Sequence, residues 1–209
     1  MDLSALAKVQ ASIRACRDCP EMCGTPVHGP ALHSSLFLLG QAPGLHEAGL
    51  GKPFAYTAGR TLFKWFHEAT GIQEEAFREK IYMAAVARCF PGKSKSSGGD
   101  REPNAVEIEK CRRHLKQEVA ILRPKLILAV GRVAIQQSLG DSVFKKATPL
   151  AEVVGKVFRS NFLGQEVDVI PLPHPSGISS WPRVEPGKSK LAEALRRVRE
   201  HPAWSETFA

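Results

Sequence analysis

Four short apolar runs constrain the fold of this 209-residue chain more than any other feature. They cover residues 36–39, 81–87, 125–130 and 167–172. Each run is mostly apolar, as is typical of parallel strands that are buried on both faces. Helical segments separate the runs, so strand and helix alternate along the chain. We therefore predict a three-layer α/β/α fold whose four-stranded sheet is mainly parallel.

Helices are predicted where apolar residues recur with helical spacing. Asn104, followed three residues later by Glu107, has the pattern of a capping box, and Gly71 should end an earlier helix. The predicted helices cover 3–16, 60–70, 104 to about 122, a short segment after Gly131, and 187–200. Residues 40–59 are expected to form a loop, and 153–164 a hairpin or an irregular β segment. We see no repeat or linker and expect one domain over residues 1–209.

The composition bounds the class of protein. Hydrophobic residues make up 43% and charged residues 24%, which is ordinary for a soluble globular protein. No apolar run approaches the roughly 20 residues that span a bilayer, and the segment from Met1 to Leu6 lacks the features of a signal peptide. We expect a monomeric cytoplasmic protein with no membrane partner.

The net charge points to the kind of partner. A formal charge of +8 favours a polyanion, most simply a nucleic acid. The competing interpretation is a basic, solvated surface with no such partner.

The cysteines have the spacing of a metal site. Cys16 and Cys19 form a Cys-x-x-Cys pair after a helix, Cys89 follows the second apolar run, and Cys111 lies in a predicted helix. In a reducing compartment metal ligation is a better explanation than disulfides. The pattern does not separate zinc from an iron–sulfur cluster, nor exclude buried, unrelated thiols. Cys23 is an alternative fourth ligand or a free thiol.

Two motifs lie just past predicted strands, where open α/β sheets place their ligands. Gly40-Gln41-Ala42-Pro43-Gly44 follows the first apolar run, and His174-Pro175-Ser176 follows the last. Although they are far apart in sequence, we expect them to meet at one edge of the sheet.

Several motifs, taken in order, resemble the iron–sulfur members of the uracil-DNA glycosylase superfamily, the groups called family 4 and family 5. The resemblance covers most of the chain, from Cys16 to Ser176. Its elements are Cys16-x-x-Cys19, residues 40–44, 51–54 and 58–59, 85–89, Cys111, 124–131, and 174–176.

The resemblance implies a compact α/β/α domain that acts on DNA. It implies a 4Fe–4S cluster, with a structural role, on Cys16, Cys19, Cys89 and Cys111. The implied reaction is hydrolysis of the N-glycosidic bond of deoxyuridine in DNA, which releases free uracil and leaves an abasic site.

The resemblance also implies roles for the residues that would hold the everted base. A neutral His174 would donate a hydrogen bond to the uracil carbonyl as negative charge develops on the leaving base. Phe54 would stack on the ring. Gln41, with Ala42, would contact the base and help to position water.

A second set of residues would contact the DNA. Pro43, Gly44 and Ser176 would lie against its backbone, because small residues and free N–H groups allow close phosphate approach. Ile178 is the candidate wedge for the space left by the flipped base, and Arg183 would hold a phosphate.

The sequence departs from the family 4 pattern at two positions. Gln41 stands where family 4 has Glu, and Ala85 stands where it has an Asn that reads the uracil edge. Without that amide, selectivity for uracil should fall, as in family 5. Glu47 is the one carboxylate of the first-motif loop and is expected to orient the water, with His46 as the alternative.

Two other functions compete with this interpretation. One is a non-catalytic or broad-specificity protein that binds uracil-containing or abasic DNA, which the changes at Gln41 and Ala85 favour. The other is a zinc-binding nucleic-acid protein of another class.

Overall fold

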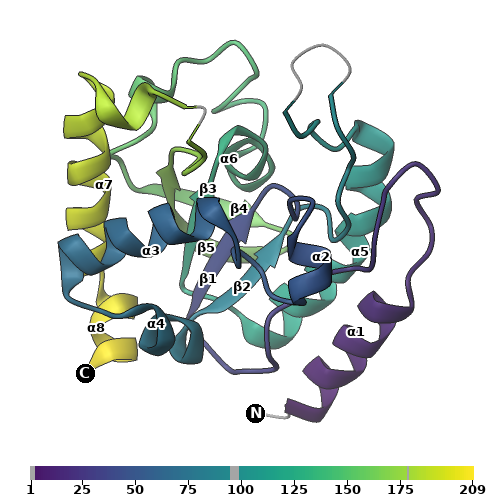
Figure 1. Ribbon diagram of the computed structural model, residues 1–209. Helices are drawn as coiled ribbons and strands as arrows, with labels where there is room; N and C mark the ends of the chain where they lie inside the picture. The colour runs from purple at the N-terminus through teal and green to yellow at the C-terminus, as the bar shows by residue number, and fades with distance from the viewer. Residues whose placement is uncertain (1–2, 95–98, 178) are drawn as a thin grey trace.

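The computed structural model describes residues 3–94, 99–177 and 179–209. The chain forms a five-stranded sheet with helices on both sides (Figure 1). In chain order the elements are α1 (Leu3–Ala15), β1 (Leu36–Gly40), α2 (Glu47–Leu50), α3 (Thr57–Thr70), α4 (Glu74–Lys80), β2 (Tyr82–Ala85), α5 (Ala105–Leu122), β3 (Leu126–Val130), α6 (Arg132–Leu139), η1 (Leu150–Glu152), β4 (Phe158–Phe162), β5 (Gln165–Leu172), η2 (Trp181–Arg183), α7 (Gly187–Glu200) and α8 (Pro202–Phe208).

The sheet has the strand order β2-β1-β3-β5-β4. The four predicted apolar runs form β1, β2, β3 and β5, which are parallel to one another. Every residue of β1 and β3 is buried, because helices cover both faces of the sheet. The carboxyl ends of β1, β2, β3 and β5 therefore meet at one edge.

The predicted count of four strands is wrong by one. The segment 158–162 forms β4, which pairs antiparallel with β5 at the sheet edge. Leu163 and Gly164 link the two strands, with φ of 55° and 91°. Two such residues give the tight hairpin whose twist matches the strands. We predicted a hairpin or an irregular β segment at 153–164, which includes β4, but did not count it as a strand of the sheet.

Most predicted helices lie where expected. The Asn104 side chain accepts from the Glu107 backbone N–H, and the Glu107 carboxylate accepts from the Asn104 N–H, so the capping box is confirmed. Gly71 ends α3 in the left-handed conformation. Helix α3 begins at Thr57 rather than at Arg60, and α2 forms within the segment predicted as a loop.

The helices form two layers. Figure 1 shows α3, α7 and α8 on one side of the strands, with α1 and α5 on the other. Helix α1 packs on α5, and α3 packs on α7. One continuous hydrophobic core joins the buried strands to these helices. Among the residues described, no helix is long and apolar enough to cross a membrane.

Candidate active site and cysteine cavity

Glu47 fixes the loop that follows β1. Its carboxylate accepts a hydrogen bond from the Gly44 backbone N–H at 2.6 Å and another from the Ala55 N–H at 3.1 Å. Burial raises the pKa of Glu47, and these N–H donors oppose the rise. Both carboxylate oxygens therefore hold two stretches of loop together.

Phe54 is held in a conformation that is unusual for a bulky residue. Its φ is +53°, in the left-handed region. Arg78 donates to the carbonyl oxygens of Pro53 and Phe54, each at 2.9 Å. A Cβ at Gly59 would lie 1.7 Å from the Phe54 carbonyl oxygen, so only glycine fits there. Such maintained strain is typical of functional sites.

Phe54 also covers the end of β1. A Cβ at Gly40 would lie 2.8 Å from Cζ of the Phe54 ring, so the ring rests against the bare backbone of Gly40. Together they enclose a cavity of about 20 Å³, enough for one water molecule and too small for a pyrimidine. It is lined by Val27, Gly40, Ala42, Pro43, Glu47, Pro53, Phe54, Ala84 and Ala85.

Only some of the residues predicted to contact the base line this cavity. Ala42, Phe54 and Ala85 line it, and Ala85 pairs with Gly40 in the sheet register. Gln41 does not line it; its carbonyl oxygen accepts from the Ala87 N–H at 3.0 Å. His46 is exposed, and its ring lies 4.3 Å from the ring of Tyr56.

His174 follows β5, and its ring is held by its neighbours. The Ser176 backbone N–H donates to Nδ1 at 3.2 Å. Nδ1 is thus the acceptor, and in the neutral ring Nε2 carries the proton. A Cβ at Gly131 would lie 3.0 Å from Cδ2 of His174, so this glycine makes room for the imidazole. Burial lowers the pKa of His174, which favours the neutral form.

Asp100 links the two loops. A Cβ at Gly44 would lie 3.5 Å from Oδ2 of Asp100 and 3.6 Å from Oε2 of Glu47. The Asp100 carboxylate also acts on His174, where it raises the pKa and partly offsets burial. His174 itself does not line the small cavity, and Asp100 is the neighbour that relates it to the first loop.

A larger open cavity, of about 360 Å³, lies beside the second loop. Ser176 and Arg183 line it together with Lys64 and Trp65 of α3. Arg183 is exposed and donates to the carbonyl oxygens of Gly177 and Ser179, at 3.1 and 3.4 Å.

The other predicted DNA contacts differ in exposure. Pro43 is buried and Gly44 half-buried. Ile178 lies outside the described residues.

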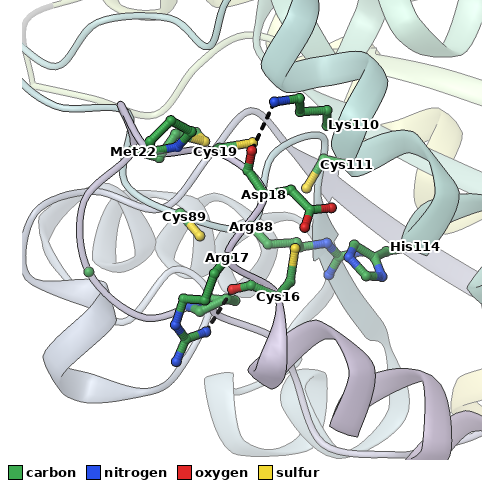
Figure 2. A pocket seen from close by; sticks show the side chains of 13 residues that line it. Cys16, Arg17, Asp18, Cys19, Met22, Arg88, Cys89, Lys110, Cys111 and His114 are labelled. Atoms are coloured by element: carbon green, nitrogen blue, oxygen red, sulfur yellow. Dashed lines mark hydrogen bonds between the residues drawn. The ribbon is translucent and has the colours of Figure 1, made fainter.

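The four predicted ligand cysteines surround one cavity of about 230 Å³. Figure 2 shows their sulfur atoms directed toward a common space from three segments: Cys16 and Cys19 after α1, Cys89 after β2, and Cys111 on α5. Burial and the neighbouring thiols raise the pKa of Cys89 to about 11. Cys23 is exposed and does not line the cavity.

The thiols surround a space and do not meet at a point. Within 3–94, 99–177 and 179–209, no three His, Cys, Asp or Glu side chains form a group that fits a metal ion. Two buried polar side chains, Arg88 and His114, also line the cavity and keep nitrogen atoms without a hydrogen-bond partner in the described part of the chain. Four soft donors and these orphaned nitrogens fit an electron-rich, sulfur-ligated group.

Sequence reasoning missed three residues of these sites. Arg88 precedes Cys89, and His114 lies three residues after Cys111 on α5, so local spacing offered a signal for both. Asp100 carried no such signal, because only the folded chain brings it to Gly44.

A model of the uracil DNA glycosylase superfamily matches residues 26–199. The chain belongs to this superfamily. The match includes both loops, Cys89 and Cys111, and begins after Cys16 and Cys19. The resemblance found in the motifs is thus confirmed, as is the α/β fold class.

Proteins named type-4 uracil-DNA glycosylase are similar over most of this chain. The one from Archaeoglobus fulgidus is 28% identical over 187 residues, which cover 87% of each chain. The one from Pyrobaculum aerophilum is 27% identical and covers 85% of this chain and 86% of its own. The one from Thermotoga maritima is 29% identical and covers 80% of each.

Proposed function

We propose that this protein is a DNA-repair glycosylase that hydrolyses the N-glycosidic bond of deoxyuridine in DNA, releasing uracil and leaving an abasic site. The observation that carries the proposal is His174 at the carboxyl edge of the sheet, a ring whose lowered pKa favours the neutral form and whose Nδ1 accepts from the Ser176 N–H, so that Nε2 carries the proton to donate. The superfamily membership and the names of the relatives support it.

In the proposed reaction the base is everted from the helix, because the bond is out of reach in a stacked duplex. The bond between C1′ and N1 breaks, and its electron pair leaves with the uracil. His174 Nε2–H donates to the uracil carbonyl oxygen on which negative charge grows. A donor that is already in place lowers the barrier by about 2.7–4 kcal/mol.

Phe54 and Gly40 would form the base pocket, with Ala42 and Gln41 beside the ring. Since the cavity holds only about 20 Å³, the Phe54 ring must leave Gly40, or the loop must open, as the base enters. Stacking of the Phe54 ring on the base would then contribute about 1–3 kcal/mol.

A water molecule attacks C1′ and gives its proton to a carboxylate. Glu47 is our candidate for that carboxylate, since it lines the cavity and burial raises its pKa. Asp100 is the alternative, since it lies beside Gly44 and acts on His174. The test compares the excision rates of Glu47→Gln and Asp100→Asn, since loss of the group that takes the proton should lower the rate strongly. Kd is measured alongside, because Glu47→Gln also removes an acceptor that holds the loop.

Ala85 favours a broad range of bases. It lines the pocket with a methyl group and offers no hydrogen bond to tell uracil from other bases. The test is a panel of oligonucleotides that carry uracil, hypoxanthine, xanthine or thymine, each treated with the protein and then with alkali. Cleavage at uracil is the expected result, and no cleavage at any base would refute the proposed activity.

For the DNA, we propose that Gly44, Ser176 and Arg183 approach the phosphates, with Pro43 supporting the first loop from its buried position. The 360 Å³ cavity beside Ser176 and Arg183 supports this path. The insertion of Ile178 as a wedge stays a prediction.

We further propose that Cys16, Cys19, Cys89 and Cys111 hold a 4Fe–4S cluster. When bound, it would crosslink three segments of the chain and serve structure. The arrangement supports a cluster over a single zinc ion, which needs four sulfur atoms about 2.3 Å from one point. The test is iron and sulfide analysis of the purified protein, with four of each expected and zinc alone as the contrary result.

The second candidate function is a protein that binds uracil-containing or abasic DNA without cleaving it. Gln41, Ala85 and the small volume of the pocket favour it. The same oligonucleotide panel decides, since this function predicts binding without cleavage.

A further inference from the structure

Arg88 and His114 are buried polar side chains with unused nitrogen atoms. Each is 1% exposed. Among the described residues, Nε and Nη1 of Arg88 and both ring nitrogens of His114 have no hydrogen-bond partner. Buried donors are nearly always paired, because an unpaired one loses its water without compensation. These four atoms therefore call for a partner.

The place where that partner would sit is the cysteine cavity. Both side chains line it together with Cys16, Cys19, Cys89 and Cys111. His114 is three residues from Cys111 on α5, so the two share a helix face. Figure 2 shows the side chains of Arg88 and His114 next to each other, and the charge of Arg88 acts on His114.

A buried network uses one Arg88 nitrogen and leaves the other two without a partner among the described residues. Nη2 pairs with the carboxylate of Glu118, which is fully buried. Tyr82 donates its hydroxyl to the other Glu118 oxygen at 2.7 Å, and Gln10 donates to the Tyr82 oxygen at 3.3 Å. With Nη2 held on Glu118, the guanidinium plane is set, and Nε and Nη1 are left over.

We propose that Arg88 and His114 donate hydrogen bonds to the sulfur atoms of the group that the four cysteines hold. Arg88 donates with Nε–H and Nη1–H, and His114 with one ring N–H. The inference rests on the proposed cluster. Such outer donors orient and retain a metal centre, and hydrogen bonds to its sulfurs set its reduction potential.

The positive charge of Arg88 should raise the reduction potential of the cluster, as its hydrogen bonds do. A cation and N–H donors stabilise electron-rich sulfur, and more so after an electron is added. Their removal should lower the reduction potential of the cluster and speed its loss.

The experiment compares purified cluster-containing variants. His114→Leu removes one donor and leaves no partner stranded. Arg88→Met combined with Glu118→Met removes the buried ion pair as a unit, so no lone charge stays behind. Tyr82→Phe is the matched control, because it removes a hydrogen bond of the same network without touching the cavity. The readouts are the reduction potential of the cluster and the rate of iron release to a chelator.

We expect a lower potential and roughly tenfold faster iron release in His114→Leu and in the double variant, with Tyr82→Phe close to wild type. Wild-type potential and release rate in His114→Leu would overturn the inference, and this single variant suffices if the double one does not fold. A protein that holds zinc instead of iron would overturn the cluster and this inference together. Failure to excise uracil, with the predicted potentials intact, would overturn only the proposed activity.

Discussion

His174 and Gly131 together define the site at the scale of single residues. The imidazole is held by the Ser176 N–H on one side and by the bare backbone of Gly131 on the other. Neither contact follows from the motif letters alone, since Gly131 belongs to a different strand end. The His174-Pro175-Ser176 motif identified the imidazole, whereas its orientation depends on contacts that form only in the folded chain.

Gly131→Ala should displace the His174 ring, because the new Cβ would lie 3.0 Å from Cδ2. We expect an excision rate lower by roughly 100-fold, the scale of a 1 Å displacement of a catalytic group. Gly140→Ala is the matched control: its φ of +77° gives a similar strain to the +86° of Gly131, with no atom near the new Cβ. Equal losses of excision rate in both variants would contradict this role of Gly131.

The pH dependence of excision should report the protonation of His174. Burial lowers its pKa from 6.5, and in the proposed reaction the neutral ring is the active form. Activity is therefore expected to persist below pH 6.5 and to fall as pH falls through the lowered pKa. Asp100 raises that pKa, so Asp100→Asn should move the acid limb of the single-turnover rate to lower pH. An acid limb that moves to higher pH in Asp100→Asn would contradict the interaction between Asp100 and His174.

At the scale of elements, the sequence predicted those helices and strands whose formation depends on residues close together in the chain. The apolar runs predicted four strands, and Asn104 with Glu107 predicted the start of α5. Strand β4 was not added to the sheet, because its alternating burial and its pairing depend on β5. The place of Asp100 beside the site was missed for the same reason, because its neighbours Gly44 and His174 lie far away in sequence.

Asn104→Ala should destabilise the fold without affecting the chemistry. It removes the side-chain acceptor for the Glu107 N–H, 2.9 Å away, and so opens the capping box. We expect the free energy of unfolding to fall by about 1 kcal/mol in a denaturant titration, with an unchanged excision rate. A large loss of excision would mean that the α5 start acts on the site.

At the scale of the whole molecule, charge and topology act together. The parallel sheet brings the loops after β1, β2, β3 and β5 to one edge, while the net charge of +8 draws a polyanion to the surface. The cysteine cavity joins the end of α1 to β2 and α5. The family motifs pointed to the residues of both candidate sites, because the motifs stand after strands, after α1 or in α5.

Arg183→Ala should weaken binding to all DNA sequences alike. Arg183 is exposed at the 360 Å³ cavity, and in our proposal it contacts a phosphate and not a base. In a salt titration of Kd we expect weaker binding and a slope of log K against log salt reduced by about 1. An unchanged slope would mean that Arg183 does not contact a DNA phosphate.

The most direct test of the account is single-turnover excision from a uracil-containing oligonucleotide by the iron-containing protein and its His174→Ala variant, with Kd measured alongside. We predict that the wild-type protein leaves an alkali-labile abasic site. The variant should be slower by roughly 10²–10³-fold with nearly unchanged Kd, since the Nε2–H acts on charge that forms only as the bond breaks. His33→Ala, at an exposed histidine, should match wild type. No excision by the wild-type protein, or equal rates with and without His174, would contradict the account.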